Sequence, residues 1–303
     1  MKVSVITPFY NGNEYMDPYQ EMLLLNEENM DPEDELEVII VNDSPKAAVK
    51  LQGTVMVKKN WKVIKNPENL GIHGSRLAGL SECTGDYVIF LDQDDELRKD
   101  AIACFIAEAK QVASEKSSDG NCHQVIVANA LLEQKHERAI WYRTAYHSKK
   151  IGDLNTYINI GTQIISPGQC MIPKNLIPDF WKTHVMKNNG ADDYFLWILM
   201  LQEGVPFTYL DKPLYIHHFT AKNISSDTKE TDRSCYEFIE YLEEKEGFPK
   251  DYAMRLKEML TTKDAFRNGS VFQKLGICIK KPGIIIRNLI FKLRTHTRYG
   301  FNR

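Results

Sequence analysis

Residues 87–95 have the sequence Tyr-Val-Ile-Phe-Leu-Asp-Gln-Asp-Asp, an apolar run followed at once by acids. The apolar part is typical of a buried strand, and the acids follow where that strand leaves its sheet. In open α/β sheets, ligands bind beyond the carboxyl ends of the strands. Mg²⁺ and Mn²⁺ bind few carboxylates and fill their other coordination positions with oxygens such as those of phosphate. The acids after residue 91 therefore indicate a divalent cation beside a diphosphate. A solvated acidic turn that caps the next helix is the alternative interpretation.

The bulk composition is that of a soluble globular protein. The 303 residues are 43% hydrophobic and 26% charged, and the net charge of −3 gives the chain no general attraction to nucleic acid. Six scattered cysteines without a CxxC pair favour buried free thiols over disulfides or zinc, which suits a reducing compartment. A strand-like start leaves no room for a signal peptide, and no apolar run is long enough to cross a bilayer. We therefore expect a cytoplasmic protein.

Strand-like and helix-like segments alternate through the first 140 residues, which indicates a mostly parallel sheet with helices on both faces. The first strand is expected to stop at Pro8. Expected strands cover residues 2–7, 36–41, 61–65, 87–91 and 124–130, and expected helices cover residues 15–29, 74–83 and 101–114.

The pattern weakens beyond Ile140. Residues 151–171 mix apolar residues with Gly, Asn and Gln, as a segment that covers a substrate would. We expect a helix over 191–203, an edge strand over 206–210, and a pair of helices over 235–260 that is broken near Gly247-Phe248-Pro249.

Short polar segments follow several of the expected strands. They are Thr7-Pro8-Phe9-Tyr10-Asn11, Val41-Asn42-Asp43, Asn69-Leu70-Gly71 with Ser75-Arg76, and Asp92-Gln93-Asp94. In order and spacing, these segments resemble the nucleotide-binding half of the family 2 glycosyltransferases, of the kind that builds bacterial surface polysaccharides. The resemblance covers roughly residues 1–220 and is strongest up to Asp95.

The resemblance implies an α/β protein with the GT-A fold, a Rossmann-like, mostly parallel sheet flanked by helices. Residues 1–220 would form the nucleotide-sugar-binding and catalytic domain. Residues 221–303 would form a helical C-terminal region that ends in a basic amphipathic tail.

The resemblance also implies a set of donor-binding residues. Thr7 would contact the nucleobase, and Asp43 would accept a hydrogen bond from it, most often from uracil. Arg76 would lie by the base or the diphosphate. Without the resemblance, Asp43 would be interpreted as a helix cap and Arg76 as a solvated helix residue. The other expected donor-binding residues are Pro8, Tyr10, Asn11, Asn69, Gly71 and Gln93.

By the same resemblance, the acids after residue 91 divide between sugar and metal. Asp92 would hold the ribose or the sugar. Asp94 would bind a Mn²⁺ or Mg²⁺ ion that bridges the diphosphate. Asp95 is an additional acid, so either Asp94 or Asp95 could be the main metal ligand.

The segment from Ala191 to Trp197 resembles the Glu-Asp-Tyr segment of the family, in which the second acid is the general base. An inverting transfer needs a carboxylate to take the proton of the attacking hydroxyl. Asp193 is the expected base, and Asp192 replaces the usual Glu. The alternative is a helix start that is enriched in acids because the helix dipole favours them.

His217 and His218 follow a strand-like run, where the family often has a Tyr-Arg-x-His pattern. By that register His218 is the better candidate for a metal or diphosphate ligand, although His217 is not excluded. Ile216 replaces the arginine, and Lys222 or Arg233 is a candidate substitute. An ordinary surface or core histidine pair is the alternative.

The C-terminal tail is basic and amphipathic. Ile284, Ile285, Leu289 and Leu293 are expected to share one helical face. A helix of this kind suits the inner, anionic face of a membrane, and a terminal helix packed on the body is the alternative. Nucleic acid is disfavoured because the interleaved aromatics of a base-stacking surface are missing. From Ser270 onward the chain has no acid, and its cations are Lys274, Lys280, Lys281, Arg287, Lys292, Arg294, Arg298 and Arg303.

Together these features predict an inverting, metal-dependent hexosyl- or N-acetylhexosaminyltransferase. It would move a sugar from a nucleotide-diphosphate donor, which the resemblance implies to be UDP-linked, to a hydroxyl of a glycan or lipid-linked acceptor in cell-surface polysaccharide synthesis. A catalytically silent scaffold subunit of a polysaccharide assembly complex is the alternative. A nucleotidyltransferase or a dehydrogenase is disfavoured, because residues 8–16 contain a single glycine and no Gly-rich phosphate loop.

Overall fold

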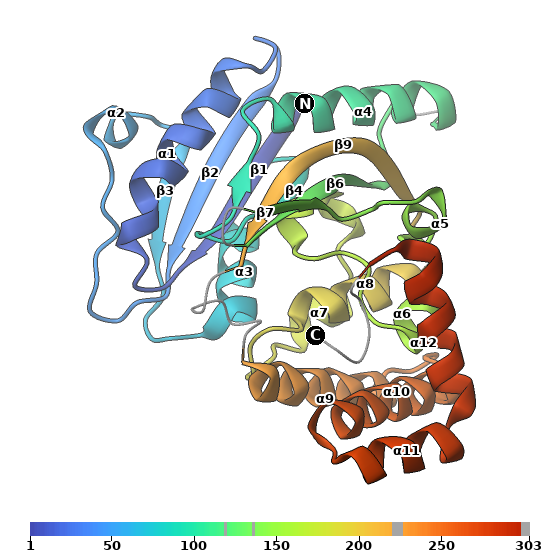
Figure 1. Ribbon diagram of the computed structural model, residues 1–303. Coiled ribbons are helices and arrows are strands. Elements are labelled where there is room, and N and C mark those ends of the chain that lie inside the picture. Colours follow the sequence, from blue (N-terminus) through green and yellow to red (C-terminus); the bar gives the residue numbers. More distant parts are fainter. Residues whose placement is uncertain (118–119, 135–136, 220–226, 298–303) are drawn as a thin grey trace.

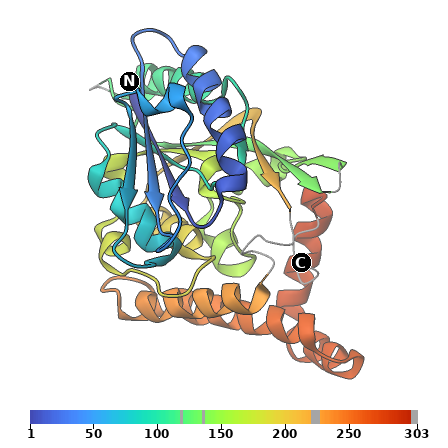
Figure 2. The ribbon, with the colours of Figure 1, turned by 90° about the vertical axis from the view of Figure 1, so that its left-hand side faces the viewer.

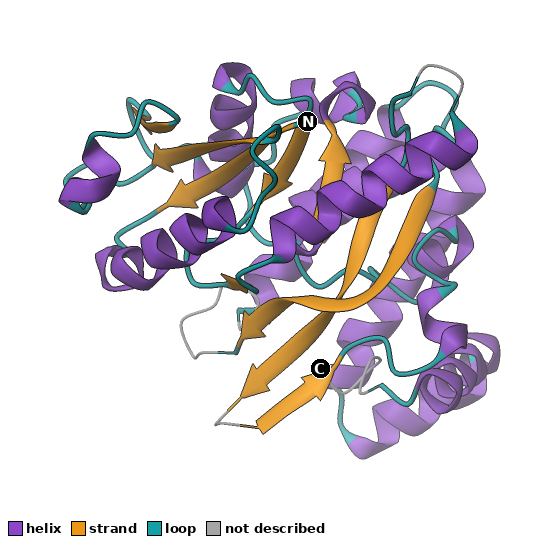
Figure 3. Ribbon diagram, turned by 90° about the horizontal axis from the view of Figure 1, so that it is seen from above, coloured by secondary structure: helices purple, strands orange, loops and turns teal. Residues whose placement is uncertain are grey.

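A computed structural model of the chain describes residues 1–117, 120–134, 137–219 and 227–297. Within these residues, helices flank a curved, nine-stranded mixed sheet (Figures 1 and 3). The strand order is β3 (Trp61–Lys65), β2 (Glu35–Asn42), β1 (Lys2–Phe9), β4 (Tyr87–Phe90), β8 (Cys170–Pro173), β6 (Val125–Gln134), β9 (Phe207–His218) and β5 (Glu96–Leu97), with β7 (Glu137–Ile140) beside β6.

The first half of the sheet is parallel. Strand β1 lies between β2 and β4 and pairs with both in parallel, and β2 also pairs in parallel with β3. Helix α1 (Asn13–Glu28) covers one face, where Tyr19 meets Thr7, and α3 (Gly71–Glu82) covers the other, where Gly79 meets Ile6. A methyl group on Gly79 would lie 2.3 Å from Ile6 Cγ2, so glycine allows α3 its close approach. The carboxyl ends of β1, β2 and β4 consequently meet at one edge of the sheet.

The second half of the sheet mixes both directions. β8 runs antiparallel between β4 and β6, and β9 runs parallel to β6. The prediction of a mostly parallel sheet is therefore accurate for the first half only. Two short predicted strand-like runs, 206–210 and 214–216, are parts of the single curved strand β9 (Figure 1). Within the described residues, β9 is an edge before Tyr215, where its pairing with β5 begins.

The other predicted strands and helices are present, and their ends shift by four residues or fewer, except that the helical pair predicted over 235–260 extends from 228 to 268. Pro8 does not end β1, because pairing with β2 continues to Phe9 although pairing with β4 stops at Ile6. The segment 151–171, which the sequence predicts to cover a substrate, leads into β8, a strand of four residues that the sequence pattern does not predict. The remaining elements before residue 203 are α2 (Gly53–Met56), α4 (Ala101–Lys116), α5 (Ala145–Ser148), α6 (Leu154–Asn159), η1 (Pro167–Gln169), η2 (Lys174–Leu176), α7 (Asp179–Thr183) and α8 (Asp192–Gln202).

The C-terminal region is helical, as predicted. Helices α9 (Thr228–Glu244) and α10 (Lys250–Asn268) run along one side of the molecule, and α11 (Val271–Lys280) and α12 (Pro282–Thr295) extend from them (Figure 2). The predicted break lies between α9 and α10. Phe238 of α9 stacks on Phe195 of α8 with ring centroids 5.8 Å apart, and the hydrophobic core is continuous from the sheet into α9 and α10. The predicted domain boundary at residue 220 stays a prediction.

The six cysteines are free, as the sequence predicts. Cys83, Cys122, Cys170 and Cys235 are buried. None of the described helices has both the length and the apolar character that a bilayer-crossing segment requires.

Candidate functional site

One cleft, with a volume of about 610 Å³, lies at the carboxyl ends of the parallel strands. Loops after β1, β2 and β4 form one wall, and the start of α8 and the end of β9 contribute to it. Residues 161–167 and helices α9 and α10 form the rest. The residues predicted from the sequence that line this cleft are Pro8, Tyr10, Asp43, Arg76, Asp92, Gln93, Asp94, Asp192 and Asp193.

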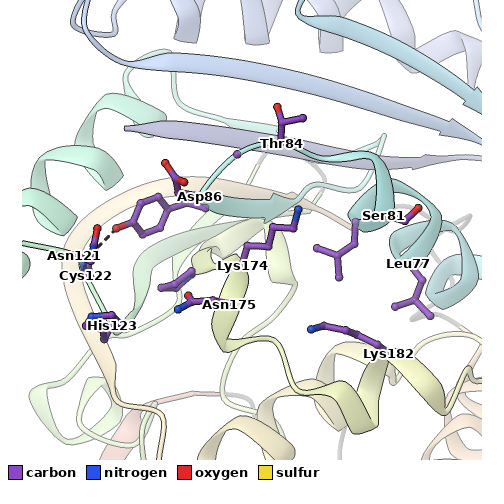
Figure 4. A pocket seen from close by; sticks show the side chains of 14 residues that line it. Leu77, Ser81, Thr84, Asp86, Asn121, Cys122, His123, Lys174, Asn175 and Lys182 are labelled. Atoms are coloured by element: carbon purple, nitrogen blue, oxygen red, sulfur yellow. Dashed lines mark hydrogen bonds between the residues drawn. The ribbon is translucent and has the colours of Figure 1, made fainter. Parts of the chain in front are cut away.

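A larger hollow, of about 960 Å³, lies at the opposite end of β4 (Figure 4). It is lined by Asp86 and Tyr87 at the start of that strand and by Lys174 and Lys182. It contains none of the predicted site residues. Because ligands of open α/β sheets bind at the carboxyl ends of strands, the smaller, acid-lined cleft is the candidate site.

Arg76 joins the two groups of acids in the cleft. Its Nη1 donates a hydrogen bond to Asp192 Oδ2, and its Nη2 donates one to Asp92 Oδ1, each at 2.7 Å. The side chains of Arg76 and Asp192 are each only 4% exposed. Burial opposes the charge of the guanidinium, but Asp192 and Asp92 outweigh that effect and raise the pKa of Arg76. This ion pair holds the loop after β4 against the start of α8.

Asp43 fixes the start of α3, the helix whose second turn carries Arg76. Asp43 accepts hydrogen bonds from the backbone N–H groups of Leu70 and Gly71 at 2.8 and 3.0 Å, and from Asn66 Nδ2 at 2.8 Å. Gly71 has a φ of 75°, which glycine adopts without strain. Asp43 thus caps α3 from a neighbouring strand end. Since it also lines the cleft, its contact with a nucleobase stays a prediction.

Gln93 connects the loop after β4 to the loop after β1. Its Oε1 accepts a hydrogen bond from the Tyr10 N–H at 3.1 Å, and its Nε2 donates one to the Tyr10 carbonyl at 3.2 Å. A methyl group on Gly12 would lie 2.3 Å from Gln93 Oε1, so glycine leaves room for this contact. Gln93 thereby fixes the position of Tyr10 at the mouth of the cleft.

Asp94 and Asp95 have different surroundings. Asp95 is buried, accepts a hydrogen bond from the Tyr215 hydroxyl, and has its Oδ1 2.9 Å from His217 Nδ1. Asp94 lines the cleft. Burial and the charges of Asp95 and Asp92 raise the pKa of Asp94 to about 6. This concentration of negative charge is what a bound cation would relieve.

Asp192 and Asp193 occupy the first turn of α8, where the helix dipole favours acids. Asp192 is buried, and its carbonyl accepts a hydrogen bond from Trp181 Nε1 at 2.8 Å. Asp193 is half-buried, lines the cleft, and accepts a hydrogen bond from the Tyr194 N–H at 2.7 Å. Burial and the charge of Asp192 raise the pKa of Asp193 to about 7. A carboxylate with such a pKa is well suited to accept a proton near neutral pH.

Thr7, Asn11, Asn69 and Gly71 are not among the residues that line the cleft. The Thr7 hydroxyl is fully buried on the α1 side of the sheet, 2.6 Å from the Tyr19 hydroxyl. Asn11 has a left-handed backbone with a φ of 50°, and Asn69 accepts a hydrogen bond from the Gly71 N–H at 3.0 Å. The Thr7 side chain therefore points away from the cleft, which corrects the prediction that it contacts the nucleobase. Contacts of Asn11, Asn69 and Gly71 with the donor stay predictions.

His217, rather than His218, lines the cleft. Neighbouring residues of a strand point to opposite faces, so His218 lies on the other side of β9, with its Nε2 3.3 Å from Glu96 Oε2. The choice of His218 as the metal ligand is corrected by this register. Of the candidate substitutes for the missing arginine, Arg233 is 64% exposed and outside the cleft lining, and Lys222 lies outside the described residues.

The sequence did not reveal the wall formed by α9 and α10, which includes Asp232, Lys263 and Arg267. Arg267 Nη2 donates to Asp232 Oδ1 at 3.2 Å, and Lys263 Nζ donates to the Ile160 carbonyl at 2.7 Å. The four-residue spacing of Lys263 and Arg267 places both on one helix face. That spacing does not tell which part of the fold the face meets.

The cleft fits a cation that is completed by phosphate. Within the part of the chain that the structure describes, no group of three or more His, Cys, Asp and Glu side chains is arranged to hold a metal by itself. Mg²⁺ binds through one or two carboxylates plus phosphate oxygens and does not need such a cage. Asp94 offers a hard oxygen ligand, and His217 lies on the same wall beside Asp95. Binding of Mn²⁺ or Mg²⁺ stays a prediction.

Replacing Arg76 by Met should destabilise the protein by about 3–5 kcal/mol, because two carboxylates are left close together without their cation. Arg98→Met, which removes an exposed ion pair with Asp100, is the control and should cost less than about 1 kcal/mol. Urea unfolding at neutral pH measures the free energy of unfolding of both variants and of the wild type. Adding Asp192→Asn to Arg76→Met should recover part of the loss. Equal costs for the two single variants would contradict the assigned role of Arg76.

Several curated proteins are similar to this chain over part of its length. Poly(ribitol-phosphate) beta-N-acetylglucosaminyltransferase TarS from Staphylococcus aureus is 34% identical over 113 residues, which cover 36% of this chain and 19% of TarS. Amylovoran biosynthesis glycosyltransferase AmsB from Erwinia amylovora is 34% identical over 103 residues, which cover 33% of each protein. An uncharacterized glycosyltransferase from Haemophilus influenzae is 25% identical over 261 residues, covering 80% of this chain and 76% of that protein. The chain thus spans about a fifth of TarS and a third of AmsB.

Solved structures of TarS residues 1–349 have the same fold. The complex with UDP-GlcNAc has a TM-score of 0.57 and 18% identity, covering 94% of this chain and 81% of that one. The complex with UDP has a TM-score of 0.57 and 18% identity, covering 97% of this chain and 85% of that one. At this identity the likeness is one of fold alone, and it supports the predicted GT-A architecture with its C-terminal helices.

A family match connects the cleft to the sequence. Residues 4–176, more than half of the chain, match the family described as glycosyl transferase family 2. The matched stretch contains Asp43, Arg76, Asp92 and Asp94, which line the cleft. The chain belongs to the family 2 glycosyltransferases.

Proposed function

We propose that the protein transfers one sugar from a nucleoside-diphosphate sugar to an acceptor hydroxyl, with inversion at the anomeric carbon and with a divalent cation. The observation that carries this proposal is the meeting of two acid groups in one cleft. Asp92 and Asp94 follow β4, Asp192 and Asp193 begin α8, and Arg76 bonds to both groups. About 100 residues of sequence separate the groups, so the fold brings them together.

The donor is proposed to be UDP-linked. The TarS structures of the same fold contain UDP-GlcNAc or UDP, and TarS is named as an N-acetylglucosaminyltransferase. UDP-GlcNAc is therefore the first donor to test. Pro8, Tyr10 and Asp43 line the end of the cleft where β1 and β2 finish, and this end would take the base. Asp92 would then face the ribose or the sugar.

Each proposed step uses a named group of this chain. The acceptor oxygen attacks the anomeric carbon, the bond from that carbon to the diphosphate oxygen breaks, and the acceptor proton moves to the Asp193 carboxylate. Arg76 holds Asp92 and Asp192 in place, so the positions of these two carboxylates in the cleft are fixed before the donor binds. A cation held by Asp94, with His217 nearby, would supply positive charge for the departing diphosphate.

The acceptor is proposed to be a glycan or a lipid-linked saccharide of a cell-surface polysaccharide. The names of TarS and AmsB refer to poly(ribitol phosphate) and to amylovoran biosynthesis. In this chain, the wall of the cleft formed by α9 and α10 lies outside the matched family segment. That wall faces the acids, so we assign it to the acceptor.

Asp94→Asn should weaken the Mn²⁺-assisted binding of UDP-GlcNAc at least tenfold, because a charged ligand of the cation is lost. Isothermal titration with and without Mn²⁺ measures this effect. Asp86→Asn, at the other end of β4, is the control and should bind as the wild type does. If Asp94→Asn keeps the full Mn²⁺ effect, Asp94 is not the cation ligand. If the wild type binds no nucleotide sugar at all, the proposed function is wrong.

Asp193→Asn should leave donor affinity intact and lower kcat by about 10²- to 10⁴-fold, because only the proton acceptor is lost. Since the pKa of Asp193 is raised to about 7, the wild-type kcat should rise as the pH increases through 7 and then level off. The residual kcat of the variant should lack that rise.

Glu203→Gln, just beyond the far end of α8, is the matched control for Asp193→Asn and should keep both kcat and its pH profile. An Asp193→Asn variant with full turnover would favour another base. A wild type that binds UDP-GlcNAc and never transfers to any saccharide would favour the catalytically silent scaffold.

A further inference from the structure

Helix α11 turns its apolar stripe to solvent. Phe272, Leu275 and Ile279 recur at the three- and four-residue spacing that places side chains on one helix face. The side chains of Phe272 and Ile279 are 86% and 81% exposed, respectively. An amphipathic helix of a globular protein normally packs such a stripe against the core.

Helix α12 also exposes an apolar stripe to solvent. Ile286, Leu289, Ile290 and Leu293 follow the same spacing and are all exposed. The buried side of α12 is formed instead by Asn288, Phe291 and Thr295, and Phe291 packs on Tyr146 and His147 of α5. The sequence prediction of a shared face is thus right for Leu289 and Leu293. Ile285, four residues before Leu289, lies on the same face although it is half-buried, whereas Ile284 lies on another side of the helix.

The charges around the two stripes have one sign. Residues 270–297 contain no acid, and their cations are distributed along both helices. Lys281 pairs with Glu258 of α10, and the Arg294 guanidinium lies 5.1 Å from the centre of the Tyr146 ring. The cations of this segment are Lys274, Lys280, Lys281, Arg287, Lys292 and Arg294.

We propose that the exposed stripes of α11 and α12 bind the surface of an anionic lipid bilayer. The apolar side chains would enter the boundary between headgroups and acyl chains, and the cations would contact the lipid headgroups. Charge complementarity favours a bilayer over a second copy of the chain. Two copies that met through these stripes would bring their basic residues together, whereas an anionic leaflet matches both the apolar and the basic character.

The binding surface lies close to the cleft along the chain. Arg267 lines the cleft, and Phe272 is five residues later. With 3.8 Å between consecutive Cα atoms, these two Cα atoms are separated by at most about 19 Å. A protein bound to the bilayer through α11 therefore holds its α10 wall near the membrane surface. This step rests on the proposed function, and it identifies the acceptor as one that carries a lipid.

Vesicle flotation with the full chain tests the proposal. The wild type should bind vesicles that contain phosphatidylglycerol and phosphatidylcholine, and should bind vesicles of phosphatidylcholine alone much more weakly. Phe272→Ser/Ile279→Ser should lower the partition coefficient by on the order of tenfold or more, because two exposed apolar side chains no longer enter the bilayer. Lys280→Gln/Lys292→Gln should lower it for anionic vesicles only, and added salt should remove that difference.

Val57→Ser is the matched control, because Val57 is 80% exposed in the N-terminal half of the chain. This variant should bind vesicles as the wild type does. Equal binding by Phe272→Ser/Ile279→Ser and the wild type would overturn the proposal, and so would a wild type that ignores anionic vesicles. Loss of a dimer on gel filtration of that variant, without a change in vesicle binding, would assign the stripes to self-association.

The proposed membrane binding and the proposed transfer can fail separately. Phe272→Ser/Ile279→Ser should bind UDP-GlcNAc in vesicle-free buffer with wild-type affinity, because the stripes do not line the cleft. A wild type that binds anionic vesicles but no nucleotide sugar would contradict the proposed function alone. A wild type that binds the donor but no vesicles would contradict the membrane proposal alone.

Discussion

The buried guanidinium of Arg76 is the interaction on which the cleft depends. Carboxylates gathered in one cleft repel one another, and a fold keeps them together only with compensating positive charge. Arg76 supplies that charge internally and bonds to one acid from each group. The remaining acids, Asp94 and Asp193, line the cleft with raised pKa values. The protein therefore presents two carboxyl groups whose charge is costly until a ligand arrives.

This arrangement follows from the order of the strands. Parallel pairing of β1, β2 and β4 brings their carboxyl ends to one edge, and Asp43 fixes the start of α3 there. The antiparallel strand β8 then separates the parallel half from β6 and β9, so the chain returns to the same edge through α8 and the end of β9. Helices α9 and α10 close the opposite wall. The cleft is consequently built from both halves of the sheet and from the C-terminal helices.

Much of the parallel half could be predicted from the sequence, because its strands are short apolar runs followed by polar residues. The run at 87–91 and the acids after it are a local signal. Other features depend on tertiary register. The family pattern favours His218, and only the pleat of β9 shows that His217 is the histidine that lines the cleft. The exposed face of α12 depends on how Phe291 packs against α5, which no periodicity specifies. The α9 and α10 wall likewise depends on packing.

Anomalous X-ray scattering from manganese, in crystals grown with UDP and Mn²⁺, tests the central claim most directly. If the acids joined by Arg76 form a donor site, one manganese peak should lie between Asp94 and the UDP phosphates, with the uracil at the ends of β1 and β2. A manganese ion away from Asp94, or UDP bound in the larger hollow beside Lys174 and Lys182, would contradict the assignment of this cleft.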